Sequence, residues 1–302
     1  MGSACAKAIL FGEHAVVYGE PGIAIPVPQL TVTATFSEQD YMKSFRSLHI
    51  NSPEVGLDTD IYDLKSTHPI RHLIELLQIE LGISELPHKT LTIRSSIPLE
   101  SGLGSGAATS IAIIRAFSGE YDHPLSVDRV SALAYEIEKI YHGTPSGIDN
   151  QVIAHGIPIF FRKGSPVEPL NLTQSLPLII ANSGIKSPTR EVVGDIRDHF
   201  DQHEQVIHEI GSLSLAARDA LLRWDMEQVA TLMNENQRLL RLLTASNERL
   251  NDLIDIALKA GAPAAKLTGA GRGGNLIALY RNELERMHIQ KALSEAGAQV
   301  YL

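Results

Sequence analysis

The sequence is poor in cysteine, in positive charge and in long apolar runs. Cys5 is the single cysteine among 302 residues, so no internal disulfide can form, which fits a reducing compartment. No apolar run approaches the roughly 18 residues of a membrane span, and the N-terminus lacks the basic and then apolar segments of a secretory signal. Acidic residues outnumber basic ones by 35 to 26, and the net charge of −9 argues against bulk binding to nucleic acid or anionic membranes. These absences predict a soluble, cytoplasmic protein with neither kind of partner.

The rest of the composition is that of a folded protein, since 44% of the residues are hydrophobic, and the length favours two domains. Apolar periodicity predicts, in the first half, strands over 4–11, 22–36 and 90–95 and helices over 67–81, 107–117 and 126–141. In the second half it predicts a strand at 176–181, helices over 191–260 with breaks near 224–225 and 246, strands at 266–268 and 276–280, and a helix over 284–295. The pattern therefore predicts an α+β protein, with a mixed β/α domain over 1–170 and a helix-rich α+β domain over 171–302.

A first glycine cluster, Ser-Gly-Leu-Gly-Ser-Gly-Ala-Ala over residues 101–108, lies between a predicted strand and a predicted helix. Glycines let the backbone turn sharply and approach a ligand closely. The free N–H groups at the start of the helix, with the positive end of its dipole, then form an anion site. The cluster predicts a phosphate-binding loop. The alternative is a tight turn whose small residues serve only packing.

A second cluster, Gly-Ala-Gly-Arg-Gly-Gly over 269–274, formally matches the dinucleotide fingerprint G-x-G-x-x-G. The residues that follow, 275–280, have the pattern of a strand rather than of a helix, and no acidic residue stands at the required distance. The Rossmann interpretation therefore fails. The Walker pattern and the protein-kinase triplets H-R-D and D-F-G are also absent, so a nucleotide would need another kind of phosphate loop.

Ionisable residues occur where the core pattern would favour apolar ones. Lys7 lies in an apolar strand ahead of Gly-Glu-His, Glu138 lies at the margin of a helix's buried face, and Asp149 follows a Gly/Pro turn. Each has a plain alternative: a lysine on an edge strand, a solvated helix charge and an Asx turn. Glu138 and His142 are four residues apart but form no H-E-x-x-H, so a zinc site is not expected. A phosphate loop, a lysine and two carboxylates together indicate phosphoryl transfer.

Four motifs carry a resemblance to a known family. They are A-K-A-I-L-F-G-E-H-A-V-V-Y-G over 6–19, the loop over 98–108, H-G-T-P-S-G-I-D-N over 142–150, and the C-terminal glycine motif over 266–274. In this order they resemble the motifs of the GHMP family of galacto-, homoserine, mevalonate and phosphomevalonate kinases. The first and third are similar to the forms that mevalonate kinases carry. The resemblance extends over nearly the whole chain.

The resemblance implies a two-domain fold, with an N-terminal domain like ribosomal protein S5 domain 2 and a ferredoxin-like C-terminal domain. The activity it implies is Mg2+-dependent transfer of phosphate from ATP to the 5-hydroxyl of (R)-mevalonate, in isoprenoid precursor synthesis. Two alternatives stay open. One is another small-molecule kinase of the family, acting on phosphomevalonate or on a different hydroxyl of mevalonate, and the other is a non-catalytic ligand sensor. A homodimer also stays open, because dimers are common among such kinases.

The resemblance also implies roles for single residues. Asp149 is the expected catalytic acid/base and Lys7 its neighbouring cation. Three residues are expected near the substrate: Glu13, His14 and Thr189. Eight are expected to bind the nucleotide: Pro98, Ser101, Gly102, Leu103, Gly104, Ser105, Gly106 and Ala107.

The expected metal site departs from the family pattern. Glu138 is the expected magnesium ligand, but Gly106 stands where the family has a second loop serine that binds the metal. Coordination would then rest on Glu138, Ser105, phosphate oxygens and water. In the C-terminal loop, Arg272 replaces a common glycine and Asn275 a common cysteine. Arg272 either adds a cation to the phosphate site or points to solvent.

Overall fold

The computed structural model describes residues 1–38, 47–98, 101–143, 145–187 and 189–301. The chain forms two compact units, each built from segments that are distant in sequence. The first unit comprises residues 1–6, 26–98 and 104–156, and the second comprises 7–25, 99–103 and 157–302. The phosphate-loop segment thus passes from one unit to the other between Leu103 and Gly104. The family-domain division at 170/171 stays a prediction.

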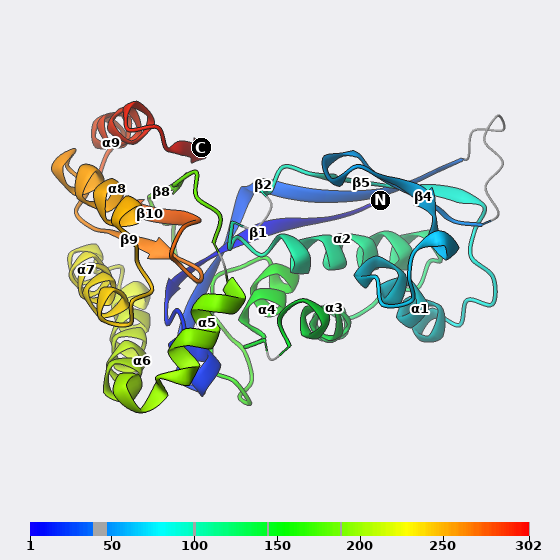
Figure 1. The fold of residues 1–302 in the computed structure, drawn as a ribbon, viewed down its shortest axis with the longest axis horizontal. Coiled ribbons are helices and arrows are strands. Elements are labelled where there is room, and N and C mark those ends of the chain that lie inside the picture. The colour runs from blue at the N-terminus through cyan, green and yellow to red at the C-terminus, as the bar shows by residue number, and fades with distance from the viewer. Residues whose placement is uncertain (39–46, 99–100, 144, 188, 302) are drawn as a thin grey trace. The chain divides into compact units, whose positions relative to one another are not determined.

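The first unit is a mixed sheet, with both antiparallel and parallel strand pairs, covered by helices on one face (Figure 1). Its strands run in the order β4-β3-β5-β2, and β1 pairs with β2. Their bounds are β1 Gly2–Phe11, β2 Gly22–Glu38, β3 His49–Ser52, β4 Leu57–Asp60 and β5 Lys89–Ser95. The long strands β1 and β2 extend into the second unit. Val32 and Ala34 of β2 are buried while Thr31 and Thr35 are exposed, which is the alternation that the sequence predicts.

Four helices of the first unit lie together along that sheet (Figure 1). They are α1 Pro69–Leu81, α2 Ser105–Glu120, α3 Val127–His142 and α4 Ile148–His155. Leu73, Ile74 and Leu77 form the buried face of α1, at the helical spacing that predicts it. The hydroxyl of Ser126 accepts from the backbone N–H of Arg129 at 3.2 Å, so α3 begins at its predicted cap.

The second unit contains a four-stranded antiparallel sheet in the order β11-β8-β10-β9. Along the chain, β8 is followed by helices, then by β9 and β10, by one more helix and by β11. This is the β-α-β-β-α-β connectivity of the ferredoxin-like fold, which confirms the expected fold class. The strands are β8 Leu178–Asn182, β9 Ala265–Thr268, β10 Asn275–Leu279 and β11 Gln299–Tyr301. Two short strands, β6 Ile159–Phe161 and β7 Glu168–Pro169, continue the first sheet: β6 pairs with the start of β2, and β7 pairs with β6.

Five helices accompany this sheet: α5 Thr189–Asp198, α6 Phe200–Leu222, α7 Met226–Leu242, α8 Glu248–Lys259 and α9 Glu283–Glu295. The predicted breaks near 224–225 and 246 fall between α6, α7 and α8, and a further break after Asp198 separates α5 from α6. Helices α7, α8 and α9 pack on the sheet, and a buried apolar cluster joins them to it. Among the described helices, none is long and apolar enough to cross a membrane.

Candidate functional site

The two glycine clusters that the sequence presents separately meet in the second unit. A Cβ placed on Gly269 would lie 3.2 Å from the carbonyl oxygen of Gly102, and one on Gly274 would lie 2.8 Å from that of Ser101. The side-chain amide of Asn275 donates to the Ser101 carbonyl at 2.6 Å. The backbones of 101–103 and of 269–274 therefore pack directly on each other, because no side chain separates them. Asn275, which departs from the family pattern, holds this contact.

The loop over 269–274 is also fixed from its other side. Gly271 has a φ of 82°, and a Cβ there would collide with the carbonyl of Ala245. The hydroxyl of Ser187 donates to the carbonyl of Gly271 at 2.8 Å. Ser187 lies two residues before Thr189, whose backbone N–H donates to the Ser187 carbonyl at 2.9 Å. The half-buried Thr189, the first residue of α5, thus follows the residue that binds the glycine loop, and its expected role near the substrate stays a prediction.

Arg272 takes neither of the two predicted roles. Its guanidinium pairs with Asp195 on α5 and donates to the backbone carbonyl of Thr244 at 3.0 Å and to the Thr244 hydroxyl at 3.1 Å. With its donors directed at these groups, the side chain ties the glycine loop to α5 and to the end of α7. The sequence could not show this, because both partner residues, Asp195 and Thr244, are distant along the chain from Arg272.

The second half of the phosphate loop begins α2 in the first unit. Gly104 is the N-cap with a φ of 74°, and it provides no side-chain cap. The carbonyl of Gly104 accepts from the N–H of Ala108 at 2.9 Å, so the preceding N–H groups of the first turn have no acceptor within the helix. These are the N–H groups of Ser105, Gly106 and Ala107. A phosphate is the ligand that such a helix start favours.

The buried Glu138 of α3 faces this helix start. Its Oε1 lies 3.0 Å from the point where a Cβ of Gly106 would be, and the ring of Tyr141 lies at 3.4 Å from the same point. Desolvation raises the pKa of Tyr141 to about 12, and the negative charge of Glu138 acts in the same direction. The alternative of a solvated helix charge for Glu138 is therefore wrong, and its carboxylate lies beside the glycine loop at the start of α2.

This arrangement fits magnesium better than a metal held by protein alone. Within the part of the chain that is described, no group of three or more His, Cys, Asp or Glu side chains could hold a metal ion. Mg2+ is commonly bound by one or two carboxylates together with phosphate oxygens and water. Glu138 of α3, which faces the start of α2, would provide one such carboxylate where phosphates would bind, and Ser105 is the first residue of α2.

Asp149 is the second residue of α4, where Gly147 with a φ of 94° is the N-cap. The neighbouring Asn150 is buried, and its amide donates to the Ser131 hydroxyl at 2.8 Å and to the Ser131 carbonyl at 3.2 Å. Ser131 lies two turns before Glu138 on α3. The amide of Asn150 therefore fixes the start of α4, with Asp149, on the helix that carries Glu138.

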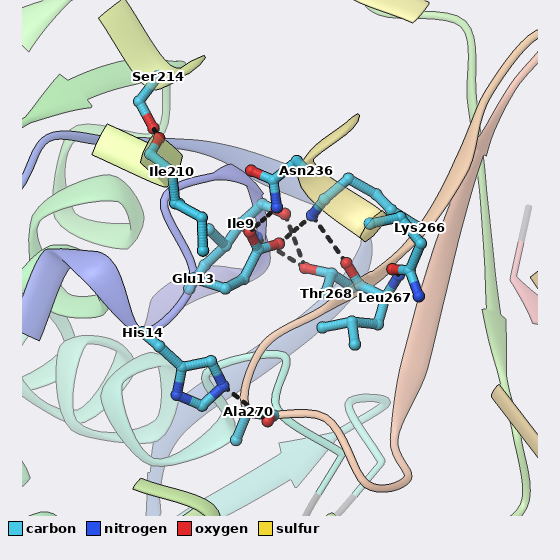
Figure 2. A network of polar contacts seen from close by, with 11 residues as sticks. Ile9, Glu13, His14, Ile210, Ser214, Asn236, Lys266, Leu267, Thr268 and Ala270 are labelled. Carbon is cyan, nitrogen blue, oxygen red and sulfur yellow. Dashed lines mark hydrogen bonds and ion pairs between the residues drawn. The ribbon is translucent and has the colours of Figure 1, made fainter. Parts of the chain in front are cut away.

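The N-terminal motif is buried in the second unit. Lys7 is 3% exposed, so the surface alternative for it is wrong, and its backbone N–H donates to the Leu103 carbonyl at 3.0 Å. His14 has a φ of 62°, and its Nε2 donates to the carbonyl of Ala270 at 2.9 Å (Figure 2). Burial lowers the pKa of His14 to about 4, so the ring is neutral at pH 7 and Nδ1 is an acceptor.

Glu13 forms an ion pair with Lys266 (Figure 2). Neither side chain is exposed. Its other oxygen accepts from the amide of Asn236 at 3.4 Å. Burial raises the pKa of Glu13 and lowers that of Lys266, and the attraction between the two charges opposes both shifts. The predicted contact of Glu13 with substrate stays a prediction.

The sequence analysis missed Lys266, Asn236 and Ser187. Lys266 carries the same signal that singled out Lys7, a lysine within a short apolar strand. Asn236 and Ser187 give no such signal, because polar residues at helix and turn positions are ordinary. Of the predicted residues, Pro98 is half-buried and precedes Leu99 and Glu100 of the loop motif, which lie outside the described residues. Thr144 of the motif over 142–150 and Pro188, which precedes Thr189, also lie outside them.

Comparison with known proteins completes this picture. A family model described as the GHMP kinases N terminal domain matches residues 68–156, and one described as GHMP kinases C terminal matches 217–299. The chain belongs to the GHMP kinase family. The N-terminal match contains the loop at α2, Glu138 and Asp149.

Relatives of this GHMP kinase include the mevalonate kinase of Thermococcus sibiricus, 34% identical with 92% of this chain and 88% of the relative covered. The mevalonate kinase of Thermococcus onnurineus is 35% identical, with 98% and 93% covered. Among solved structures, the L. major mevalonate kinase in complex with R-mevalonate has a TM-score of 0.81 and 27% identity, covering 97% of this chain and 91% of that one. The Methanococcus jannaschii mevalonate kinase has a TM-score of 0.86 and 26% identity, with 99% and 96% covered.

Proposed function

We propose that this GHMP kinase transfers the γ-phosphoryl group of ATP to the 5-hydroxyl of (R)-mevalonate. The observation that carries the proposal is the coincidence of a glycine-lined helix start with the buried carboxylate of Glu138, on a chain similar over more than nine-tenths of its length to mevalonate kinases. The similarity to a structure that contains R-mevalonate supports the same acceptor. The reaction would serve isoprenoid precursor synthesis.

In the proposed reaction, backbone N–H groups of the loop over 101–107 bind the phosphates of ATP. Pro98 precedes this loop and completes the predicted nucleotide site. Glu138 and Ser105 are the residues that would hold Mg2+, which when bound neutralises negative charge on the phosphates. The fixed orientation of the N–H groups costs no reorganisation as charge shifts during transfer.

Asp149 is the proposed base that orients and deprotonates the acceptor hydroxyl, and Lys7 is the proposed cation that offsets charge on the transferred group. His14 and Thr189 are proposed to bind the substrate, together with Glu13. Because His14 is neutral and its Nε2 is engaged by Ala270, its Nδ1 suits a hydroxyl donor better than a carboxylate.

An ATP-coupled assay tests this function with four acceptors: mevalonate, phosphomevalonate, galactose and homoserine. We expect turnover with mevalonate, and loss of at least about 10²-fold in kcat in Asp149→Asn, which keeps the shape and removes the charge. Turnover with another acceptor would reassign the substrate within the family. Saturable ligand binding without turnover of any acceptor would favour a ligand sensor. The cytoplasmic location and a homodimer stay predictions, and light scattering of the purified protein tests the second.

A further inference from the structure

Lys266 and Glu13 form a buried ion pair to which the proposed chemistry assigns no role as a pair. Lys266 lies in β9, and Glu13 follows β1 in the turn that precedes Ala15–Tyr18. Both side chains are completely buried. Removing two charges from water is costly, and the cost is offset only where the geometry and the further hydrogen bonds are good. The pair is therefore a strongly constrained feature of the fold.

Further bonds surround the pair and fix the same two segments (Figure 2). The ammonium of Lys266 also donates to the carbonyl of Leu267 at 2.8 Å. The hydroxyl of Thr268 donates to the carbonyl of Ile9 at 2.9 Å and accepts from its N–H at 2.8 Å. Together with the bond from His14 to Ala270, these contacts tie β9 and the first residues of the glycine loop to β1 and its following turn.

The position of β9 decides where the glycine loop lies. Thr268 is the last residue of β9, and Gly269 already lies against Gly102. Because these contacts join backbone to backbone, no side chain can adjust if β9 shifts. On the opposite side of the pair, β1 contacts the same segment, through the bond from the Lys7 N–H to the Leu103 carbonyl. The strand β9, which carries Lys266, and the strand β1, which leads into the turn of Glu13, thus both contact the 101–103 part of the loop.

We propose that Lys266 is a positioning residue for nucleotide binding, whose ion pair with Glu13 holds β1 and β9 at the spacing that shapes the 101–103 segment. Glu13 acts in this role through Lys266, and the role is separate from the contact with the acceptor that is proposed for Glu13 above. The proposal rests on the proposed function in one respect, that the loop over 101–107 binds the phosphates of ATP.

Three variants separate positioning from mere stability: Lys266→Met, Glu13→Gln and the double variant. Each single variant leaves one buried charge uncompensated, so we expect a lower Tm. The double variant leaves none, so its Tm should return most of the way to the wild-type value. The affinity for a non-hydrolysable ATP analogue with Mg2+, measured by calorimetry, should fall about tenfold or more in all three variants. In Lys266→Met, the KM for mevalonate should change less than about threefold, because Lys266 has no proposed contact with the acceptor.

A matched control and a conservative variant sharpen the test. Lys89→Met removes the ammonium that donates to Glu120 at 2.6 Å from β5, at a position outside both glycine clusters, and should leave nucleotide affinity unchanged. Lys266→Arg keeps the charge and should bind the nucleotide more tightly than Lys266→Met does.

A stable double variant with wild-type nucleotide affinity would overturn the proposal and reduce the pair to a core contact. A selective rise of the mevalonate KM in Glu13→Gln, at unchanged nucleotide affinity, would also overturn it and assign Glu13 to the acceptor. Because the binding measurement needs no acceptor, it is independent of the reaction. A wild-type protein that binds the analogue but does not phosphorylate mevalonate would refute the acceptor assignment, while the variants would still decide the role of Lys266.

Discussion

Gly106 is the position where this chain departs most informatively from its family, and two substitutions there test the metal site. In Gly106→Ala and Gly106→Ser, the new Cβ would lie 3.0 Å from Oε1 of Glu138 and 3.4 Å from the ring of Tyr141. These contacts are a few tenths of an ångström tighter than ordinary ones. Both neighbours are side-chain ends, which can move by that amount.

The expected effect on stability is small because two terms oppose each other. Replacing glycine by alanine in a helix stabilises by about 0.5–1 kcal/mol, and a mild overpacking costs about 1–3 kcal/mol. We therefore expect both variants to be destabilised by about 1 kcal/mol, a shift of a few degrees in Tm. For kcat we expect a change of less than about tenfold, which corresponds to about 1.4 kcal/mol.

The two variants share the same Cβ and differ only in the hydroxyl, so their difference reports the metal. Measured as kcat against Mg2+ concentration at saturating ATP and mevalonate, the serine variant should reach half-maximal rate at about two- to threefold less Mg2+ than the alanine variant. The reason is that its hydroxyl replaces a water already bound to the ion. Identical Mg2+ dependence in the two variants would remove the first turn of α2 from the metal site. Complete inactivity of both would show that the loop accepts no Cβ.

Three further predictions concern the loop, the reacting groups and pH. Gly104→Val places a β-branched side chain at a φ of 74°, and calorimetry should show a loss of ATP affinity far larger than the loss of Tm; normal ATP binding would refute the loop assignment. Lys7→Met should lower kcat. In the double variant with Asp149→Asn, the fold-loss in kcat should be much smaller than the product of the two single fold-losses, whereas a loss equal to that product would mean that the two residues act independently. His14 has a pKa of about 4 when folded and an ordinary value of 6.5, so the unfolded chain binds more protons between these pH values and stability falls as pH falls. From pH 7 to pH 5, the free energy of unfolding measured in urea should fall about 2 kcal/mol more in the wild type than in His14→Gln, and an equal fall would contradict the buried neutral ring.

Local sequence determined the elements and the kind of chemistry. Alternation at Thr31–Phe36 predicts the half-buried strand, and Ser126 predicts the start of α3, because side-chain periodicity and capping act over a few residues. The cluster over 101–108 likewise predicts an anion site at a helix start, since the N–H groups concerned belong to that helix. The order of motifs was sufficient to predict the family.

Only the tertiary structure decided which of these segments meet. The 101–103 backbone packs on the loop over 269–274, and Glu13 pairs with a lysine 253 residues further along the chain. The side chain of Arg272 binds Asp195 and Thr244, whereas the sequence predicts either the phosphate site or solvent as its environment. Such contacts leave no periodic signal in the sequence, because the two partners are brought together only by the packing of the whole unit. A buried charge is tolerated only where such a distant partner neutralises it.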